Sequence, residues 1–204
     1  MNRIVAYIAI VILVITSVAL AESAKKLELY VNGALAFPFT PDEFSDHWKP
    51  GMLNLGGGIG YNINPITSVN FYLDWCNFGL DGEKLAHDMG AGGQVTFSGS
   101  GMSVMTITGN IKACIPFGKV RPYFWGGCGF FSLSREDGSV SGGGYVVPLE
   151  GDLESTFGFN LSVGVDYLIS KTVDIFVDGR YVYGLTQSQS TSIVPLRIGV
   201  KLKL

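Results

Sequence analysis

Charged side chains are scarce in this sequence: Asp, Glu, Lys and Arg make up 15% of its 204 residues. Ordinary soluble domains carry roughly 25%. The net charge is −3, and the isoelectric point is about 5.3. This balance provides no excess of positive charge for phosphate groups, so we expect no nucleic acid among the partners.

Long apolar runs are also missing after the first twenty residues. Glycine is frequent, by contrast, at 28 residues, and aromatic residues reach 12%. Low charge combined with many glycines and aromatics is typical of an all-β protein with tight turns. The length suits a single domain.

Residues that carry chemistry are few. The three cysteines form no CxxC pair and have no histidine at ligand spacing, so we expect no metal site. Because three is an odd number, at least one cysteine lacks an internal partner. The only histidines, His47 and His87, lie in predicted loops. Without a nucleophile elbow or a phosphate loop, the sequence predicts neither an enzyme nor a bound cofactor.

The first residues have the pattern of an export signal. Arg3 precedes an apolar stretch over residues 4–20, and Ala19-Leu20-Ala21 matches a small-residue cleavage site. We expect a signal peptide over residues 1–21 and one mature domain over residues 22–204. An uncleaved helical anchor is the alternative, because the apolar stretch is long for a signal.

Beyond Ala21, apolar and polar residues alternate in eight stretches, and no convincing helical period occurs. The expected strands are 26–36, 52–62, 68–78, 102–113, 120–132, 156–169, 173–183 and 193–204.

The connections between these strands are alternately long and short. The short ones, at 63–67, 114–119 and 170–172, have the length and residues of hairpin turns. All short turns therefore lie at one end of the sheet and all long loops at the other. This asymmetry is typical of a transmembrane β-barrel.

The last strand shows which face meets the membrane. In "VPLRIGVKLKL" (194–204), every second residue from Leu196 is apolar, and the residues between include Arg197 and two lysines. Strand side chains alternate between two faces. We expect the apolar face to contact lipid, and the other face, mostly Gly, Ser, Asn and Thr, to line a narrow interior. A secreted β-sandwich or lipocalin-type barrel, with its apolar face inward, is the alternative.

An eight-stranded barrel closes by pairing its last strand with its first, which leaves no free edge. Counting the antiparallel register back from the last hairpin places Arg197 near Asp178. Opposite charges on adjacent strands offset the cost of burying either one alone. We expect an interior polar network formed by Glu28, Asp174, Asp178, Arg180, Arg197 and Lys201.

Aromatic residues near the strand ends predict interfacial belts, although each alone is compatible with ordinary packing. The predicted belt residues are Tyr61, Tyr123 and Tyr167 near the short turns, and Trp75, Phe130, Tyr181 and Tyr183 near the long loops.

Two segments carry a family resemblance. "GKVRPYFWGGCGFF" (118–131) resembles the G-x-x-R-P-Y and G-G-x-G pattern of a fifth strand, and "WKPGMLNLGGGIGYNINP" (48–65) resembles a second strand. On these residues the chain resembles the small bacterial outer-membrane β-barrel family, whose members include OmpX, OmpW and the membrane domain of OmpA. The resemblance implies an eight-stranded antiparallel up-and-down barrel in the bacterial outer membrane. It also implies a monomer surrounded by outer-membrane lipid and inserted by the barrel assembly machinery. The family usually ends in an aromatic residue, whereas this chain ends in Leu204.

We expect a structural, adhesion or surface-binding role presented by the long extracellular loops, since loops on a rigid scaffold commonly bind. The candidate contact residues are Phe44, His47, Trp48, Tyr145 and Val147. Passive transport of small solutes is the first alternative, although eight strands usually leave no open aqueous channel. A lipid-modifying enzyme is the second alternative, because some small outer-membrane barrels are hydrolases or acyltransferases.

Overall fold

The computed structural model describes residues 27–99, 101–186 and 190–204. The predicted signal peptide lies outside the described residues.

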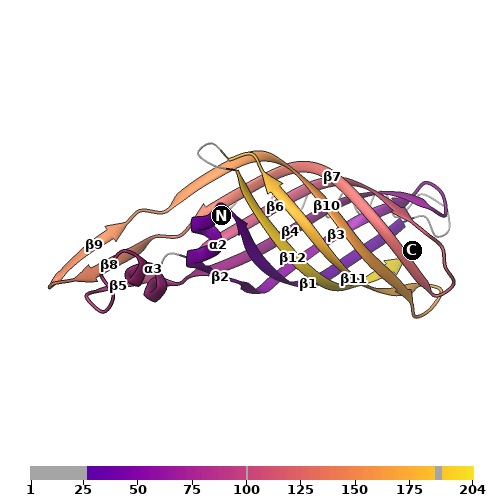
Figure 1. Cartoon of the computed structure of the whole chain (residues 1–204). Helices are drawn as coiled ribbons and strands as arrows, with labels where there is room; N and C mark the ends of the chain where they lie inside the picture. The colour runs from indigo at the N-terminus through magenta and orange to yellow at the C-terminus, as the bar shows by residue number, and fades with distance from the viewer. Residues whose placement is uncertain (1–26, 100, 187–189) are drawn as a thin grey trace.

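Eight antiparallel strands form a closed barrel (Figure 1). They are β1 (Leu27–Thr40), β3 (Gly51–Asn62), β4 (Thr67–Leu80), β6 (Met102–Cys114), β7 (Val120–Arg135), β10 (Asp152–Leu168), β11 (Val173–Gly184) and β12 (Thr191–Lys203). Each pairs with the next along the chain, and β12 pairs with β1 from Glu28–Lys203 to Thr40–Ser192. The predicted up-and-down barrel of eight strands is confirmed.

All short turns lie at one end of the barrel, the turn end, and all long connections lie at the other, the loop end (Figure 1). The strands β7 and β10 contain 16 and 17 residues and pair out to Arg135 opposite Asp152. Only about 9–11 residues are needed to span a bilayer. The barrel wall on this side therefore continues beyond the membrane at the loop end.

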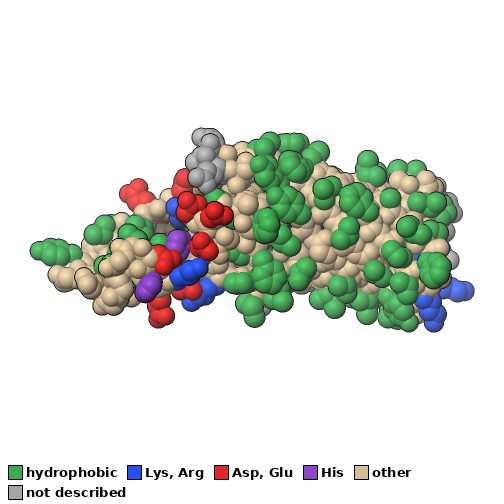
Figure 2. Space-filling model, viewed as in Figure 1, with side chains coloured by type: hydrophobic (Ala, Val, Ile, Leu, Met, Phe, Trp, Pro, Cys, Tyr) green, Lys and Arg blue, Asp and Glu red, His purple; other side chains and the backbone are tan. Residues whose placement is uncertain are grey.

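The apolar rows of the strands face outward, as predicted. Val163 is 62% exposed and Ile198 is 61% exposed, whereas their sequence neighbours Ser162 and Arg197 are buried. Figure 2 shows apolar side chains spread over the barrel wall. In a sandwich or a lipocalin-type barrel these rows would meet inside, so both alternatives are excluded.

Small polar residues line much of the barrel interior, as expected; Asn32, Ser68, Thr108, Asn110 and Ser162 are all buried. Large side chains fill the space that these small residues leave. Five rings form an aromatic layer inside the barrel: Tyr30, Tyr72, Tyr123, Trp125 and Phe176. Tyr123 was therefore wrongly predicted as a belt residue, because it lies on the inward face of β7 together with Trp125 and is 5% exposed. Of the other predicted belt residues, Tyr61, Trp75, Phe130 and Tyr167 are exposed.

Glycines make room for this aromatic layer. A Cβ atom added at Gly199 would lie 2.6 Å from the ring of Phe176, and one added at Gly164 would lie 2.7 Å from the ring of Tyr123. Real Cβ atoms do not approach other atoms this closely. The high glycine content therefore serves the packing of rings inside a narrow barrel as well as the turns.

The long connections are structured. They contain the helices α2 (Asp42–His47) and α3 (Gly82–Asp88) and the short strands β2 (Trp48–Lys49), β5 (Val95–Gly99), β8 (Gly138–Gly142) and β9 (Tyr145–Leu149). The two helices left no helical period in the sequence, because six and seven residues are too few to show one. Within the described residues, no helix is long and apolar enough to cross a membrane.

Candidate functional site

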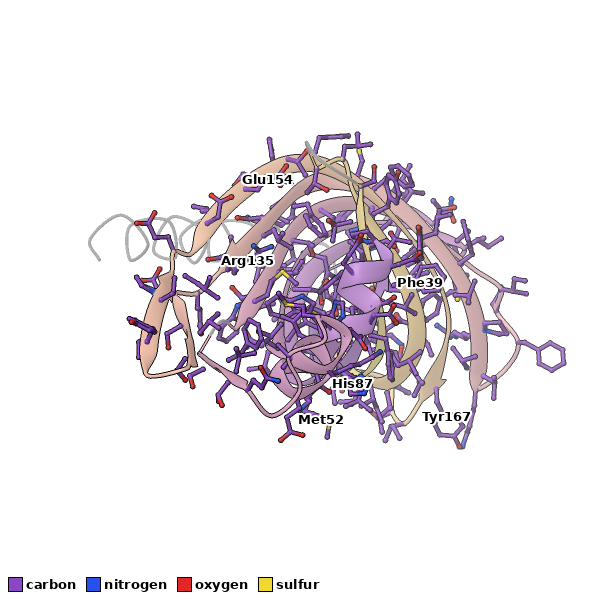
Figure 3. All side chains as sticks on the ribbon, turned by 60° about the vertical axis from the view of Figure 1, so that its left-hand side comes forward. Phe39, Met52, His87, Arg135, Glu154 and Tyr167 are labelled. Carbon is purple, nitrogen blue, oxygen red and sulfur yellow. The ribbon has the colours of Figure 1, made fainter. Side chains whose placement is uncertain are left out.

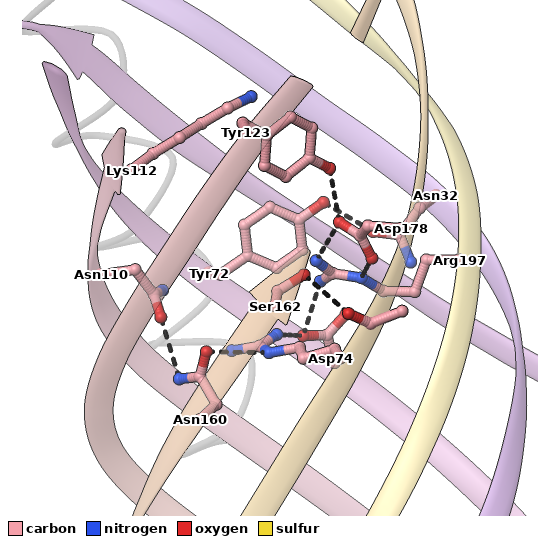
Figure 4. Close-up of polar contacts among 12 residues, drawn as sticks. Asn32, Tyr72, Asp74, Asn110, Lys112, Tyr123, Asn160, Ser162, Asp178 and Arg197 are labelled. Carbon is pink, nitrogen blue, oxygen red and sulfur yellow. Dashed lines mark hydrogen bonds and ion pairs between the residues drawn. The ribbon is translucent and has the colours of Figure 1, made fainter. Parts of the chain in front are cut away.

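The centre of the barrel holds a cluster of buried charges (Figure 4). Arg197 donates two hydrogen bonds of 2.7 Å to Asp178, from Nε and Nη2. Arg180 donates to Asp74 through Nη1 and, at 2.8 Å, to the hydroxyl of Thr108 through Nη2. Arg197 also lies 3.5 Å from Asp74, so the two pairs form one cluster. A charged side chain is tolerated in the barrel interior because its ion-pair partner and further hydrogen bonds replace its contacts with water.

A second charged cluster lies nearer the turn end. Lys201 approaches Asp166 at 2.6 Å, Asp174 at 3.0 Å and Glu28 at 3.4 Å. Lys112 also pairs with Asp166, at 2.8 Å. The aromatic layer links the two clusters, because the ammonium of Lys112 lies 3.7 Å from the ring centroid of Tyr123, whose hydroxyl donates to Asp178.

All six residues of the predicted polar network are buried in the barrel. The structure divides them between the central cluster, which holds Asp178, Arg180 and Arg197, and the turn-end cluster, which holds Glu28, Asp174 and Lys201. The prediction missed Asp74, Lys112 and Asp166. Each is a charged residue within an alternating strand, on the side that carries polar and aromatic residues, and this position was the available signal.

The two helices at the loop end are joined by a carboxylate between two histidines. Asp88 at the end of α3 accepts a hydrogen bond of 3.1 Å from His47 Nε2 of α2, and its other oxygen lies 3.5 Å from His87 Nδ1. These hydrogen bonds, that of His47 foremost, lower the pKa of the Asp88 carboxyl below its usual value. Asp46, the sequence neighbour of His47, pairs instead with Lys84 at 3.5 Å.

The candidate loop contacts fall into two groups. Phe44 is 5% exposed and packs with Trp48 and Phe78 into an apolar cluster at the loop end of the barrel, so Phe44 is not an exposed contact residue. Tyr145 and Val147, at 79% and 57% exposed, stand on β9. Strand β9 pairs with β8, and β8 pairs with β5 from a different loop. We call these three strands the loop-end sheet; it projects at the left of Figure 1.

The two ends of the molecule differ in charge. The loop end is acidic. Eleven Asp and Glu residues but only three Lys and Arg residues occur there, within residues 41–50, 81–101 and 135–154. Lys119, Arg121, Lys171 and Lys203 lie at the turn end. Figure 2 shows acidic and histidine side chains with a few basic ones at the loop end, and basic side chains at the other.

The geometry does not assemble a hydrolase site or a metal site among the described residues. There, no serine, threonine or cysteine side chain is hydrogen-bonded to either histidine ring, which a nucleophile and its base require. No cluster of three or more His, Cys, Asp or Glu residues could hold a metal ion in the part of the chain that the structure describes. His87 lies on helix α3 at the loop end (Figure 3).

The fold is shared with solved outer-membrane proteins. Neisserial surface protein A has a TM-score of 0.56 and 18% identity, with 90% of this chain and 100% of that chain covered. Ail, the attachment invasion locus protein of Yersinia pestis, has a TM-score of 0.52 and 12% identity, with 89% and 100% covered. Ail in complex with the heparin analogue sucrose octasulfate has a TM-score of 0.51 and 10% identity, with 89% and 100% covered.

No curated protein matches the sequence. The family model of the outer membrane protein beta-barrel domain, however, matches residues 8–201. The chain therefore belongs to the outer-membrane β-barrel protein family and is a protein of the bacterial outer membrane.

Proposed function

We propose that this protein is a non-enzymatic surface protein that binds a basic partner through its loop end. In barrels of this family the short turns face the periplasm and the long loops face the exterior. The observation that carries the proposal is the loop-end sheet, because strands from two separate loops are paired there into one exposed surface.

The pairing of β5 with β8 orders this surface before a partner binds. Each of the five residues of β5 has a partner in β8, from Val95–Gly142 to Gly99–Gly138. A loop that is already ordered loses less conformational freedom when a partner binds. The exposed side chains Tyr145, Val146 and Val147 supply contact area, and tyrosine is enriched in binding surfaces.

The acidic charge of the loop end favours a basic partner. A cavity of about 500 Å³ opens at the loop end, with Glu43, Asp152 and Glu154 against the single cation Arg135 in its lining. Figure 3 shows Arg135 and Glu154 on neighbouring strands at this end. The Ail complex holds a polyanion, whereas the acidic excess here favours a basic protein or peptide through electrostatic complementarity.

Passive transport is disfavoured by the filled interior. The loop-end cavity and a second cavity at the turn end have no lining residue in common, and the aromatic layer and the central charged cluster lie between them. In planar bilayers we expect no ion conductance above that of the protein-free membrane. Steady conductance like that of an open pore would support the transport alternative, and a change in lipid A mass on expression would support the enzyme alternative.

The binding test uses purified protein in nanodiscs of neutral lipid and lysozyme as a basic probe, with ovalbumin as an acidic one. We expect binding of lysozyme that weakens with salt, and none of ovalbumin. Replacing residues 138–149, which carry no charge, with a short Gly-Ser linker removes β8 and β9 and should weaken binding through loss of their exposed contact surface. Lys171→Gln in a turn at the other end is the control and should bind normally. Equal binding after removal of the hairpin would contradict the proposal.

The route to the membrane is part of the same proposal. We propose signal-directed export with cleavage after Ala21, insertion by the barrel assembly machinery and a monomer in the membrane. The amino-terminal sequence of the mature protein should begin at Glu22. A retained first segment would instead support the helical anchor.

A further inference from the structure

The turn end of the barrel contains a cavity that the proposed surface binding does not use. Its volume is about 500 Å³, and its lining includes the interior residues Glu28, Lys112, Asp166 and Lys201 together with Arg121 of β7. The turn between β3 and β4, residues 63–66, forms part of its wall. Short turns face the periplasm in this family, so the cavity opens to the periplasm.

Arg121 differs from the other cations of this cavity. Lys112, Lys201 and Lys203 each pair with a carboxylate. Among the described residues Arg121 forms no ion pair, and its Nε atom is buried without a hydrogen-bond partner. A buried donor that has lost water without gaining an acceptor is costly, so this guanidinium is poised to receive an anion.

An unpartnered acceptor belongs to the same cavity. Asp166 lies opposite Arg121 in the register of β7 and β10, and it is 1% exposed. Both of its lysine partners bind Oδ2, at 2.8 Å from Lys112 and 2.6 Å from Lys201. Its other oxygen, Oδ1, is buried without a hydrogen-bond partner. One ligand with an acceptor at one end and a donor at the other would satisfy both groups.

We propose that this cavity binds a small zwitterion, with an oxyanion on the guanidinium of Arg121 and an ammonium group on Oδ1 of Asp166. A guanidinium offers two parallel N–H donors that match the oxygens of phosphate or carboxylate. Ethanolamine phosphate has this chemistry, either as a free periplasmic solute or as the headgroup of a phospholipid in the inner leaflet.

The first test measures soluble probes by titration calorimetry, with the protein in maltoside micelles that contain no phosphate. We expect O-phosphoethanolamine to bind at least tenfold more tightly than inorganic phosphate or ethanolamine alone. Arg121→Gln should weaken it by about tenfold or more, as expected for loss of a charge-assisted hydrogen bond. Arg121→Lys should retain part of the affinity. Lys171→Gln, at a turn outside the cavity, is the matched control and should bind as the unaltered protein does.

The second test identifies the source of the ligand. Native mass spectrometry compares retention of phosphatidylethanolamine with that of phosphatidylglycerol, which lacks the ammonium group. Preferential retention that Arg121→Gln abolishes assigns the site to a headgroup, and binding of the soluble probe alone assigns it to a solute. If the unaltered protein prefers no zwitterion in either test, or if Lys171→Gln weakens binding equally, the proposal is overturned. If Arg121→Gln does not fold, the proposal is still tested by the preference of the unaltered protein for the zwitterionic probe and by the affinity of Arg121→Lys for it.

Discussion

Arg197 and Asp178 face each other across β11 and β12 in the barrel interior, where both side chains are buried. Changing Arg197 to Met leaves Asp178 with the hydroxyl of Tyr123 as a hydrogen-bond donor but, among the described residues, without a paired cation. We expect this change to lower the free energy of unfolding by roughly 3–5 kcal/mol, because an uncompensated charge remains buried. Urea unfolding in lipid vesicles, followed by tryptophan fluorescence, measures the loss.

The same pair permits a double-mutant cycle. Replacing both residues, as Arg197→Met with Asp178→Leu, should cost less than the sum of the single changes, because neither charge is then stranded. Lys84→Met is the control. It breaks the exposed contact with Asp46 and should cost no more than about 1 kcal/mol. Strict additivity in the buried pair would show that the two charges do not stabilise each other.

Two glycines on neighbouring strands provide a matched test of interior packing. A Cβ atom added at Gly127 of β7 would overlap the carbonyl oxygen of Gly109 and the side chain of Asn110. At Gly109 of β6 a Cβ atom would meet nothing within 4 Å. We expect Gly127→Ala to destabilise the barrel by about 1–3 kcal/mol and Gly109→Ala to stay within about 0.5 kcal/mol. Equal effects in urea unfolding would contradict this account.

Individual interior residues were only partly predictable from the sequence. Alternation fixes the side of each residue, so Arg197 and Lys201 could be placed inside from the last strand alone. It does not tell which large residues meet across the barrel, because Tyr72 and Trp125 come from non-adjacent strands whose rings lie 5.2 Å apart. Tyr123 was misassigned because its position near a turn was given more weight than its place in the alternation.

At the scale of elements, the strands were predictable and the loops were not. A strand with one face in lipid repeats its pattern over about ten residues, and all eight strands carried that pattern. The loop-end sheet depends on β5 (95–99) pairing with β8 (138–142), which is distant in the sequence, and each strand has only five residues. Neither periodicity nor turn chemistry encodes such a pairing.

Asp88 is the element-scale connection between α2 and α3. Asp88→Asn removes the charged acceptor of His47 and His87 and should speed amide exchange in both helices, measured by hydrogen–deuterium exchange. The folded pKa of Asp88 is lowered from 3.8. Its contribution is therefore present above that pH and is lost as the pH falls through the lowered value. The difference between the variant and the parent protein should vanish in strong acid.

Asp46→Asn is the control for the connection of α2 and α3 by Asp88, since Asp46 is exposed and its contact with Lys84 is 3.5 Å. It should leave exchange in the two helices nearly unchanged. Faster exchange in the Asp88→Asn protein that persists at every pH would show that the side chain acts by packing and not through its charge.

For the whole molecule, closure of the sheet and the direction of its side chains act together. Pairing of β12 with β1 leaves the barrel without an open edge, so the apolar strand β12 offers no free backbone for pairing with another chain. The outward rows that remain are too extensive for a water-soluble surface, on which large contiguous apolar patches are rare. Within residues 27–99, 101–186 and 190–204, the charged residues lie instead in the interior and at the two ends, which is the distribution that a bilayer around the wall requires.

Two valines with similar exposure test this placement directly. Val163 in the middle of β10 is 62% exposed, and Val147 of the loop-end sheet is 57% exposed. If water surrounded the whole molecule, arginine at either position would be nearly neutral, within about 0.5 kcal/mol. With lipid around the wall, we expect Val163→Arg to cost about 2–4 kcal/mol near the bilayer midplane, whereas Val147→Arg should remain near neutral. Urea unfolding in vesicles measures the free energy of unfolding of both variants. Equally small losses would show that water surrounds the barrel wall and would contradict the placement in a membrane.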